Sequence, residues 1–310
     1  MLNTIFILTV SLFLVIKGAT LATRYAGILA ESFRLSKYTV GFIIIAVISI
    51  LPESFIAIQS AISGVPEFGL GMLFGSNIAD LTIIFAILVF VAGRSLQVEG
   101  KILKGHGAYP FILMLPLILG LNGHLSRLEG LALIIAGGAF YYLALRDGSD
   151  STIAVPTTHN SRIKNGILLI LSMGLLFVGS NFVVSSATSL AEMVGISPVL
   201  IGMLVVGLGT TMPELFFSLN AVKRNDDSLA VGDLLGTVLA DATIVVGLIA
   251  FIAPFSFPKE IVFVTGTFMI MASFLLFYFM ESGKRLTKKE AKLLIFFWIM
   301  FMIVGFFVGQ

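Results

Sequence analysis

The sequence predicts an all-α integral membrane protein, built from ten transmembrane helices in two inverted five-helix repeats. Composition is the first reason: 58% of the 310 residues are hydrophobic and 12% are charged, which is about half the charged fraction of soluble domains. The second reason is that the pair Pro52-Glu53 recurs 161 residues later (213 − 52) as Pro213-Glu214. The third is that basic residues gather in alternate loops, a pattern typical of helices inserted across a bilayer.

Ten apolar segments are long enough to span a hydrocarbon core of about 30 Å. They cover residues 2–22, 39–63, 67–92, 106–123, 127–145, 164–187, 197–221, 228–253, 260–280 and 290–309. No basic region precedes the first segment, so we interpret it as a mature helix and not as a signal peptide. The polar stretch 146–163 follows the fifth segment and divides the chain into a first repeat, residues 1–145, and a second repeat, residues 164–310.

The loops that follow odd-numbered segments hold most of the positive charge. Sixteen basic residues lie there, whereas the opposite loops hold Arg127 and Lys259. The positive-inside rule therefore predicts that the loops after odd-numbered segments, including the linker 146–163, are cytoplasmic. It also predicts that both termini lie on the outer side of the cell membrane. Because each half has five helices, the second half enters the bilayer from the opposite side, which makes the repeat an inverted one.

The two halves match at one fixed offset and without a gap. Chance similarity between apolar segments would pair Leu with Ile, but would not readily pair glycines, prolines and acids in register. Besides the Pro-Glu motifs, the matched positions are Gly18 and Gly179, Gly41 and Gly202, Gly71 and Gly232, Gly75 and Gly236, Ala79-Asp80 and Ala240-Asp241, and Thr82 and Thr243. The sequence thus predicts an internal duplication.

Carboxylates occur at membrane depth in both halves. The four matched acids are Glu53, Asp80, Glu214 and Asp241. A charged side chain at that depth costs roughly 3 kcal/mol or more, so it persists mainly where a cation or a proton relay uses it. The proline before each glutamate breaks the preceding helical turn, which predicts freed backbone carbonyls near Ala46 and Gly207. Such carbonyls are tolerated within the bilayer only where they line a cavity or meet an ion.

The third and eighth helices each combine a hydroxyl with a carboxylate. Asp80 follows Ser76 by four residues and Asp241 follows Thr237 by four, so each pair lies on one helix face. Asp233 on the eighth helix could line the same site or face a neighbouring helix. All-oxygen surroundings of this kind suit hard cations, and their duplication predicts cation transport at the interface of the repeats.

Several function classes are excluded or disfavoured by composition. The chain has no cysteine, which excludes disulfides, thiolate metal sites and cysteine catalysis. The net charge of +2 is small and the basic residues lie in short loops, so we expect no nucleic-acid partner. No phosphate-binding loop is present, which argues against ATP-driven pumping. We expect a protein that is not an enzyme, binds no cofactor, and has inorganic cations and lipid as its partners.

The motifs resemble the alpha repeats of the calcium/cation antiporter superfamily, most closely its prokaryotic sodium/calcium exchanger branch, whose motifs read G-T-S-x-P-E and G-S-N-x-x-[ND]. The second repeat has Gly209-Thr210-Thr211-Met212-Pro213-Glu214 and Gly236-Thr237-Val238-Leu239-Ala240-Asp241; the first has Ile48-Ser49-Ile50-Leu51-Pro52-Glu53 and Gly75-Ser76-Asn77-Ile78-Ala79-Asp80. The resemblance covers nearly the whole chain and also implies ten helices in two inverted fives.

The resemblance implies a role for each motif residue. Glu53 and Glu214 would bind Ca²⁺ directly, helped by Ser49 and Thr210, and Asp80 and Asp241 would complete the central site. The flanking sites for the countertransported ion would be lined by Ser76, Thr211, Thr237 and the carbonyls of Ala46 and Gly207. The implied activity is an exchange of Ca²⁺ against Na⁺ by alternating access, with the first and sixth helices moving across the other eight.

Two departures from the family pattern leave the identity of the coupling ion undecided between Na⁺, K⁺ and H⁺. Ile50 stands where a third hydroxyl would ligate sodium, which puts a stoichiometry of three Na⁺ in question. Aspartate occupies both Asp80 and Asp241, and in potassium-dependent exchangers an aspartate at the second of these positions is associated with K⁺ use. Four carboxylates around one Ca²⁺ also leave two negative charges, so either further cations bind or one or two carboxylates carry protons.

Three alternatives remain at this point. A proton-coupled exchanger usually has a Gly-Asn-Ala-x-Glu pattern, which neither repeat has, and this favours Na⁺ over H⁺. An intramembrane aspartyl protease would use Asp80 and Asp241, but its Gly-x-Gly-Asp motif is missing and the Pro-Glu pairs would be unexplained. Channels usually build acidic rings by oligomeric symmetry, whereas this chain carries both halves itself, so we expect it to act as a monomer.

Overall fold

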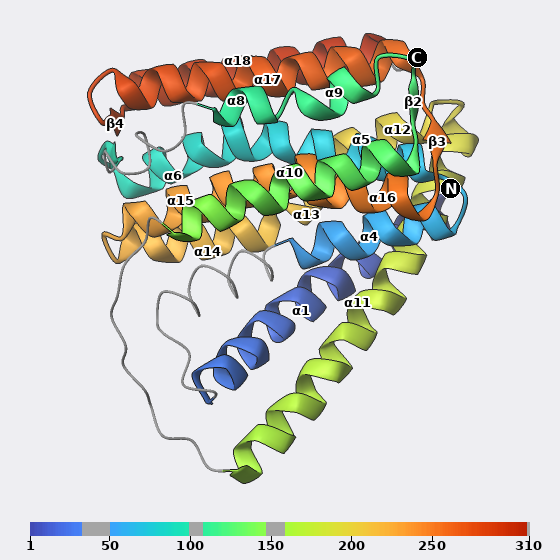
Figure 1. Cartoon of the computed structure of the whole chain (residues 1–310), viewed down its shortest axis with the longest axis horizontal. Coiled ribbons are helices and arrows are strands. Elements are labelled where there is room, and N and C mark those ends of the chain that lie inside the picture. The colour runs from blue at the N-terminus through green and yellow to red at the C-terminus, as the bar shows by residue number, and fades with distance from the viewer. Residues whose placement is uncertain (33–49, 99–107, 147–158, 309–310) are drawn as a thin grey trace.

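The computed structural model describes residues 1–32, 50–98, 108–146 and 159–308, and nearly all of its regular structure is helical (Figure 1). Seven helical segments in this part of the chain are long and apolar enough to cross a membrane. They are Leu2–Ala22, Pro66–Ala92, Arg162–Val194, Pro198–Lys223, Asp227–Ile252, Lys259–Glu281 and Lys288–Val308. The predicted all-α membrane class is therefore confirmed. The count of ten stays a prediction, because segment 39–63 is described only from residue 50.

The elements before the linker are long helices, π-helical turns (η) and two-residue strands. They are α1 (Leu2–Ser32), α4 (Leu51–Ile62), α5 (Pro66–Ala79), η2 (Asp80–Ile84), α6 (Phe85–Ala92), β1 (Leu96–Gln97), α8 (Tyr109–Ile112), α9 (Leu115–Leu119), β2 (His124–Leu125) and α10 (Arg127–Arg146).

The elements after the linker follow a similar order. They are α11 (His159–Val194), α12 (Pro198–Ile201), η3 (Gly202–Val206), α13 (Gly207–Thr210), α14 (Met212–Lys223), α15 (Asp227–Ala240), η4 (Asp241–Val245), α16 (Val246–Ile252), β3 (Phe255–Ser256), α17 (Lys259–Glu281), β4 (Arg285–Leu286) and α18 (Lys288–Val308).

Several of these elements recur at the 161-residue offset found in the sequence. Helices α4 and α14, α5 and α15, and turns η2 and η4 begin and end 161 residues apart. Helices α10 and α18 both begin with a reciprocal capping box, in which Ser126 and Glu129, or Thr287 and Glu290, bond each other's backbone N–H. The duplicated sequence therefore folds into matching local structure.

Each short strand pairs with a strand from the other half of the chain. Strand β1 pairs antiparallel with β4, with Leu96 opposite Leu286, and β2 pairs antiparallel with β3, with Leu125 opposite Phe255. Figure 1 places β4 at one end of the bundle and the β2–β3 ribbon at the other. The two halves are thus tied together at both ends.

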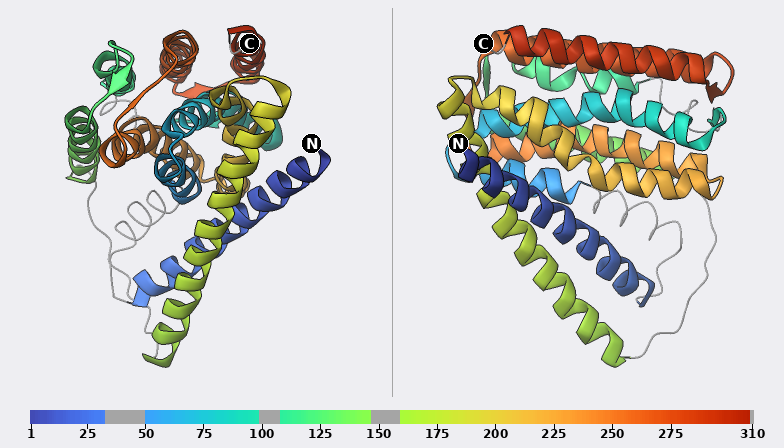
Figure 2. Two further views of the ribbon diagram at one scale, coloured as in Figure 1. Left: turned by 90° about the vertical axis from the view of Figure 1, so that its right-hand side faces the viewer. Right: turned by 180° about the vertical axis from the view of Figure 1, so that it is seen from behind.

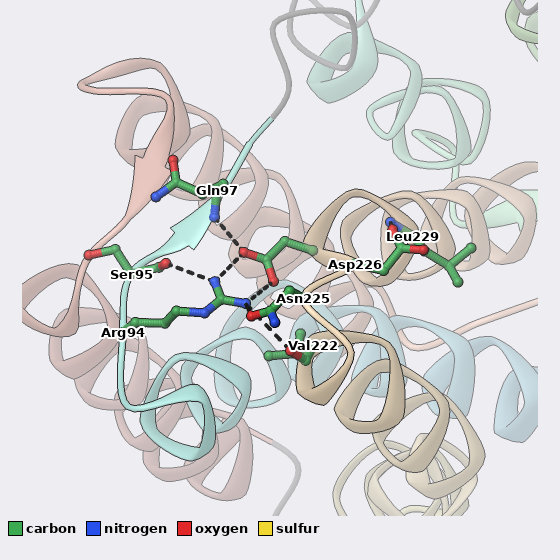
Figure 3. A network of polar contacts seen from close by, with 8 residues as sticks. Arg94, Ser95, Gln97, Val222, Asn225, Asp226 and Leu229 are labelled. Carbon is green, nitrogen blue, oxygen red and sulfur yellow. Dashed lines mark hydrogen bonds and ion pairs between the residues drawn. The ribbon is translucent and has the colours of Figure 1, made fainter.

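An ion pair reinforces the end that carries β1. The Arg94 guanidinium donates to both carboxylate oxygens of Asp227, at 2.5 and 2.8 Å, and to the side-chain oxygen of Asn225 at 3.0 Å. The backbone N–H of Gln97 donates to Asp227 at 2.8 Å. Figure 3 shows this network. We call the end of the bundle that carries it the Arg94 end.

Two predicted helices are broken. Segment 106–123 is not one helix: its described part forms α8 and α9, separated at Leu113–Met114, and Pro110 and Pro116 lie in their first turns. Proline supplies no N–H to continue a preceding helix, so each starts a new one. Segment 197–221 is interrupted at Thr211, directly before α14, as Pro213 predicted. Helices α1 and α11 extend beyond the predicted segments 2–22 and 164–187.

Helices α5 and α15, with the turns and helices that continue them, form the centre of the bundle. In the most apolar 18-residue stretch of the span Pro66–Ala92, 78% of the residues are buried, and in that of Asp227–Ile252, 72% are buried. Helices α1 and α11 run beside each other and slant away from the bundle in all three views (Figures 1 and 2).

Candidate functional site

The centre of the bundle is a crossing of two glycine-lined helices. A Cβ atom built on Gly71 of α5 would lie 2.6 Å from the Val199 carbonyl oxygen, and one built on Gly202 would lie 2.7 Å from the Phe68 carbonyl oxygen. Any side chain at these glycines would therefore push the backbones apart. The close approach brings α5, from the first half, against α12, η3 and α13, from the second half.

The proline breaks place both glutamates at the start of a helix in this core. Pro52 and Pro213 stand in the first turns of α4 and α14, and Glu53 and Glu214 directly follow them. Each glutamate side chain is 1% exposed. The first turn of a helix carries the positive end of its dipole, which favours an anion there.

Both aspartates lie where α5 and α15 pass into a π-helical turn. Asp80 begins η2 and Asp241 begins η4, and they are 1% and 0% exposed. Single π-helical turns inside α-helices are frequent at functional sites. The same local distortion therefore presents one carboxylate from each half of the chain.

The four carboxylates are linked by electrostatic interactions. Asp80 interacts with Glu53, and Asp241 interacts with both Glu53 and Asp80. Glu214 interacts with Glu53 and Asp80. In addition, the Thr210 side chain, from the second half of the chain, lies close to the Glu53 carboxylate. The two halves thus contribute to one shared acidic centre.

Much of this acidic centre has no hydrogen-bond partner within the described part of the chain. The atoms concerned are one carboxylate oxygen of Glu53, both oxygens of Asp80, Glu214 and Asp241, and the Thr237 hydroxyl. Buried carboxylates without partners are costly, because their desolvation is not offset. Their grouping around one centre is what a cation-binding site requires.

The other predicted hydroxyl groups are oriented by the preceding helical turn. Ser76 donates to the Leu73 carbonyl at 3.0 Å, Thr210 to that of Gly207 at 3.0 Å, and Thr211 to that of Leu208 at 2.9 Å. Their hydrogens are thereby turned away, which leaves oxygen lone pairs available to a cation.

One predicted feature of the backbone is wrong. The Gly207 carbonyl is not freed by the proline break, because it accepts from the Thr211 N–H at 3.4 Å and from the Thr210 hydroxyl. The Gly207 carbonyl thus keeps its helical backbone bond and accepts a second bond from a threonine side chain. The equivalent statement for Ala46, and the placement of Ser49, concern residues 33–49 and lie outside the described residues.

A closed metal cage built from acids alone is absent from the described ranges. In residues 1–32, 50–98, 108–146 and 159–308, no three side chains of His, Cys, Asp or Glu are placed to hold one metal ion together. Hard cations such as Ca²⁺ take about six to eight oxygen ligands. Hydroxyl and carbonyl oxygens would have to supply part of that set.

Two tyrosines near the acids were not foreseen from the sequence. The Tyr109 hydroxyl donates to the Leu235 carbonyl at 2.7 Å, and the Tyr141 hydroxyl donates to the Gly236 carbonyl at 2.5 Å. Both phenols lie within electrostatic range of Asp241. In an apolar segment a tyrosine is usually interpreted as a packing residue or as a residue at the membrane interface. A usable signal was that, at the repeat offset, Tyr109 and Tyr141 correspond to the apolar residues Ile270 and Met302.

Most of the chain is similar in sequence to an exchanger family and to membrane proteins of other organisms. A family model described as sodium/calcium exchanger protein matches residues 3–146 and again residues 164–307. The sodium/calcium exchanger MaX1 of Methanosarcina acetivorans is 23% identical over 345 residues, covering 97% of this chain and 98% of that protein. The inner membrane protein YrbG of Escherichia coli is 26% identical over 262 residues, covering 80% of this chain and 79% of that protein.

Solved structures share the fold. The crystal structure of the H⁺/Ca²⁺ exchanger CAX superposes with a TM-score of 0.79 at 16% identity, covering 99% of this chain and 84% of that one. The sodium-calcium exchanger NCX_Mj, soaked with 10 mM Na⁺ and zero Ca²⁺, superposes with a TM-score of 0.68 at 21% identity, covering 97% and 98%. At these identities the likeness concerns the fold alone.

Proposed function

The chain belongs to the sodium/calcium exchanger protein family, and from this premise we propose that it is a secondary active antiporter that exchanges Ca²⁺ against Na⁺ across the cell membrane. It is an integral membrane protein of an exchanger family, and its named relatives include a sodium/calcium exchanger. The finer statements that follow belong to this proposal: ten helices in two inverted repeats, both termini outside, and action as a monomer.

The observation that carries the proposal is the acidic centre shared by the two halves. Glu53 and Glu214 come from different halves of the chain, are almost completely buried, and lie within electrostatic range of each other. Buried anions in this density are stable only when cations or protons neutralise them. We assign Ca²⁺ to Glu53 and Glu214, with Asp80 and Asp241 completing the site.

The flanking ligands are assigned from the family motifs. In this proposal Thr210 and Ser49 assist the glutamates, and Ser76, Thr211, Thr237 and the carbonyl of Ala46 hold the counter-ion. Ca²⁺ and the counter-ion use the same carboxylates in turn, so that one is released before the other binds. Movement of α1 and α11 across the remaining helices opens the centre to one side of the membrane and then to the other.

A proton-coupled exchange is the second candidate. Ile50 offers no oxygen where the family motif has a hydroxyl, which weakens one sodium position. The four carboxylates supply proton-binding groups in its place. A K⁺ requirement is tested in the same way, because Ca²⁺ uptake into proteoliposomes can be driven by Na⁺, K⁺ or H⁺ gradients imposed one at a time. The gradient that drives uptake identifies the counter-ion.

Substitution of the glutamates tests the site. We expect Glu53→Gln and Glu214→Gln to reduce ⁴⁵Ca²⁺ uptake into proteoliposomes to background, because each change removes a charged ligand at the same volume. Glu192→Gln, at an exposed position of α11, is the matched control and should transport normally. Near-normal uptake by both glutamine variants would contradict the proposal, and cleavage of peptides by the pure protein would favour the protease alternative.

A further inference from the structure

The acidic centre has unequal surroundings on its two sides. At the repeat offset of 161, Asp233 of α15 corresponds to Met72 of α5. Tyr109 and Tyr141, which bond α15, correspond to Ile270 and Met302. Three polar groups therefore surround α15 at positions where the other half of the chain has only apolar side chains.

Asp233 lies between the acidic centre and the Arg94 end of the bundle. Helix α15 begins at Asp227, the partner of Arg94, and leads to Asp241. Positions 233, 237 and 241 are four residues apart, so they share one helix face at intervals of about 6 Å. Asp233 is 6% exposed and lies within electrostatic range of Asp80 and Glu214. Its carboxylate thus extends the acidic centre in one direction only.

The tyrosine hydroxyls are held so that they present oxygen lone pairs. Each phenol hydrogen is donated to a carbonyl of α15, at Leu235 or Gly236. A phenol whose hydrogen is committed can act towards any further group only as an acceptor. Tyr141 also lies within electrostatic range of Asp233 and Asp241. Its oxygen is therefore suited to a cation near these two carboxylates.

Thr237 supplies an independent indication of a ligand. It is 1% exposed, and its hydroxyl has no hydrogen-bond partner among the described residues. The hydroxyls of Ser76 and Thr243, by contrast, donate to a carbonyl of the preceding turn. A buried hydroxyl that forgoes this bond, between two carboxylates on one helix face, marks a position for an external partner.

We propose that Asp233 and Tyr141 extend the flanking position at Thr237 into an outer cation-binding position between the acidic centre and the Arg94 end of the bundle. An all-oxygen position with a carboxylate takes a hard cation, and Ca²⁺ is the probe we choose. The position rests on the proposed function, since its cation is the one that travels to or from the centre. Because Met72 occupies the corresponding place in α5, the described residues offer no such position on the route to the opposite end.

The consequence is a difference between the two faces of the protein. A cation that enters from the Arg94 end is first held at the outer position, which raises its local concentration beside the centre. A cation from the other end meets the centre directly. The concentration of Ca²⁺ that half-saturates transport is therefore lower at the Arg94 end than it would be without Asp233, and the opposite face is unaffected.

Side-specific transport by an asparagine variant tests the proposal. Gln97→Cys, in an otherwise cysteine-free chain, lets an impermeant thiol reagent report which face of the reconstituted protein points outward. In Asp233→Asn we expect the half-saturating Ca²⁺ concentration at the Arg94 face to rise about 10-fold, because a charged oxygen ligand is lost. The value at the opposite face should stay unchanged. Met72→Leu, the volume-conserving change at the corresponding position, should alter neither face.

Two results would overturn the inference: an equal change at both faces, which would make Asp233 a ligand of the centre itself, or no change at either. Should Asp233→Asn fail to fold, Tyr141→Phe serves in its place, because it removes one oxygen and keeps the ring. The variant should weaken Ca²⁺ use at the Arg94 face alone, and unchanged kinetics would refute the position. Failure of the proposed function would be recognised separately, as normal transport by Glu53→Gln.

Discussion

Helices α1 and α11 contact each other far more extensively than either contacts the rest of the bundle, whereas α5 and α15 are surrounded by other helices. In the spans Leu2–Ala22 and Arg162–Val194, 33% of the residues of the most apolar window are buried, against 78% in Pro66–Ala92. The molecule therefore has two parts: an α1–α11 pair with large exposed apolar faces, and a core that contains the acidic centre.

The glycines of the two parts are used differently. In the pair, Gly18 lies against Leu176, and Gly179 lies against Val15. Glycines that face the core would let the pair slide over it, but the close contacts of these two glycines are within the pair. Glycines of the core, such as Gly71 and Gly202, lie where α5 crosses α12 and η3. The pair is thus internally tight and loosely attached, which is the arrangement that movement as one unit needs.

A disulfide between pair and core should have the largest effect. A Cβ on Gly209 of α13 would lie 3.4 Å from the terminal carbons of the Leu12 side chain, so Leu12→Cys and Gly209→Cys place two thiols at neighbouring positions, where oxidation can join them. We expect oxidation to stop ⁴⁵Ca²⁺ uptake by the double variant and reduction to restore it.

A disulfide within the pair provides the contrast. Val15→Cys with Gly179→Cys joins α11 to α1, since a Cβ on Gly179 lies 2.9 Å from a Val15 methyl carbon. Transport should survive oxidation of this variant, because the pair moves as a unit. If this internal disulfide stopped transport as completely as the first one, movement of the pair as one body would be wrong.

One methyl group should distinguish the packing of the two parts. In Gly75→Ala the new Cβ would overlap with the Met203 carbonyl oxygen. We therefore expect a loss of about 1–3 kcal/mol in the free energy of unfolding. In Gly174→Ala on α11 the Cβ meets nothing within 4 Å, and alanine should be neutral or stabilise by up to about 1 kcal/mol.

Thermal unfolding in detergent, followed through the single tryptophan, Trp298, compares the two alanine variants directly. The difference in melting temperature between them is the relevant quantity, because both changes give the helix the same gain in propensity. Equal melting temperatures would show that α5 does not cross the second half at backbone contact.

The smallest effect concerns the end of the core. Arg94→Ala and Asp227→Ala should each destabilise the protein, and a double-mutant cycle should give a coupling of about 1 kcal/mol, because the paired groups are in direct contact. The Arg94 side chain is 36% exposed, so high salt should reduce this coupling. Arg285→Ala, at an exposed position of the nearby β4, should leave stability unchanged. A coupling of zero at low salt would mean that the strand pairing alone holds this end.

Much of the local structure could be predicted from the sequence. Pro52 and Pro213 indicated where helices begin, and Glu53 and Glu214 were expected to be buried beside them. The repeat offset predicted matching elements, and α4 and α14 indeed begin and end 161 residues apart. These predictions rest on strong local causes: a proline without an N–H, and acids too costly to face lipid.

Other features could not be predicted because they depend on the neighbours of a residue. Tyr109 and Tyr141 stand in apolar segments, and only packing shows that they bond α15. The broken segment 106–123 had its signals in Pro110 and Pro116, which hydropathy alone overlooks. The Gly207 carbonyl was expected to be free, but it accepts from the Thr211 N–H and the Thr210 hydroxyl in the next turn.

The sequence by itself determined that this is a helical membrane protein with duplicated acids, since apolar length and the cost of buried charge act on each segment separately. The tertiary structure decided that acids from both halves meet, that α1 and α11 stand apart as a pair, and that polar groups collect on the α15 side. These outcomes depend on which backbones can approach each other, and that approach is set by small residues at crossings between segments far apart in the chain.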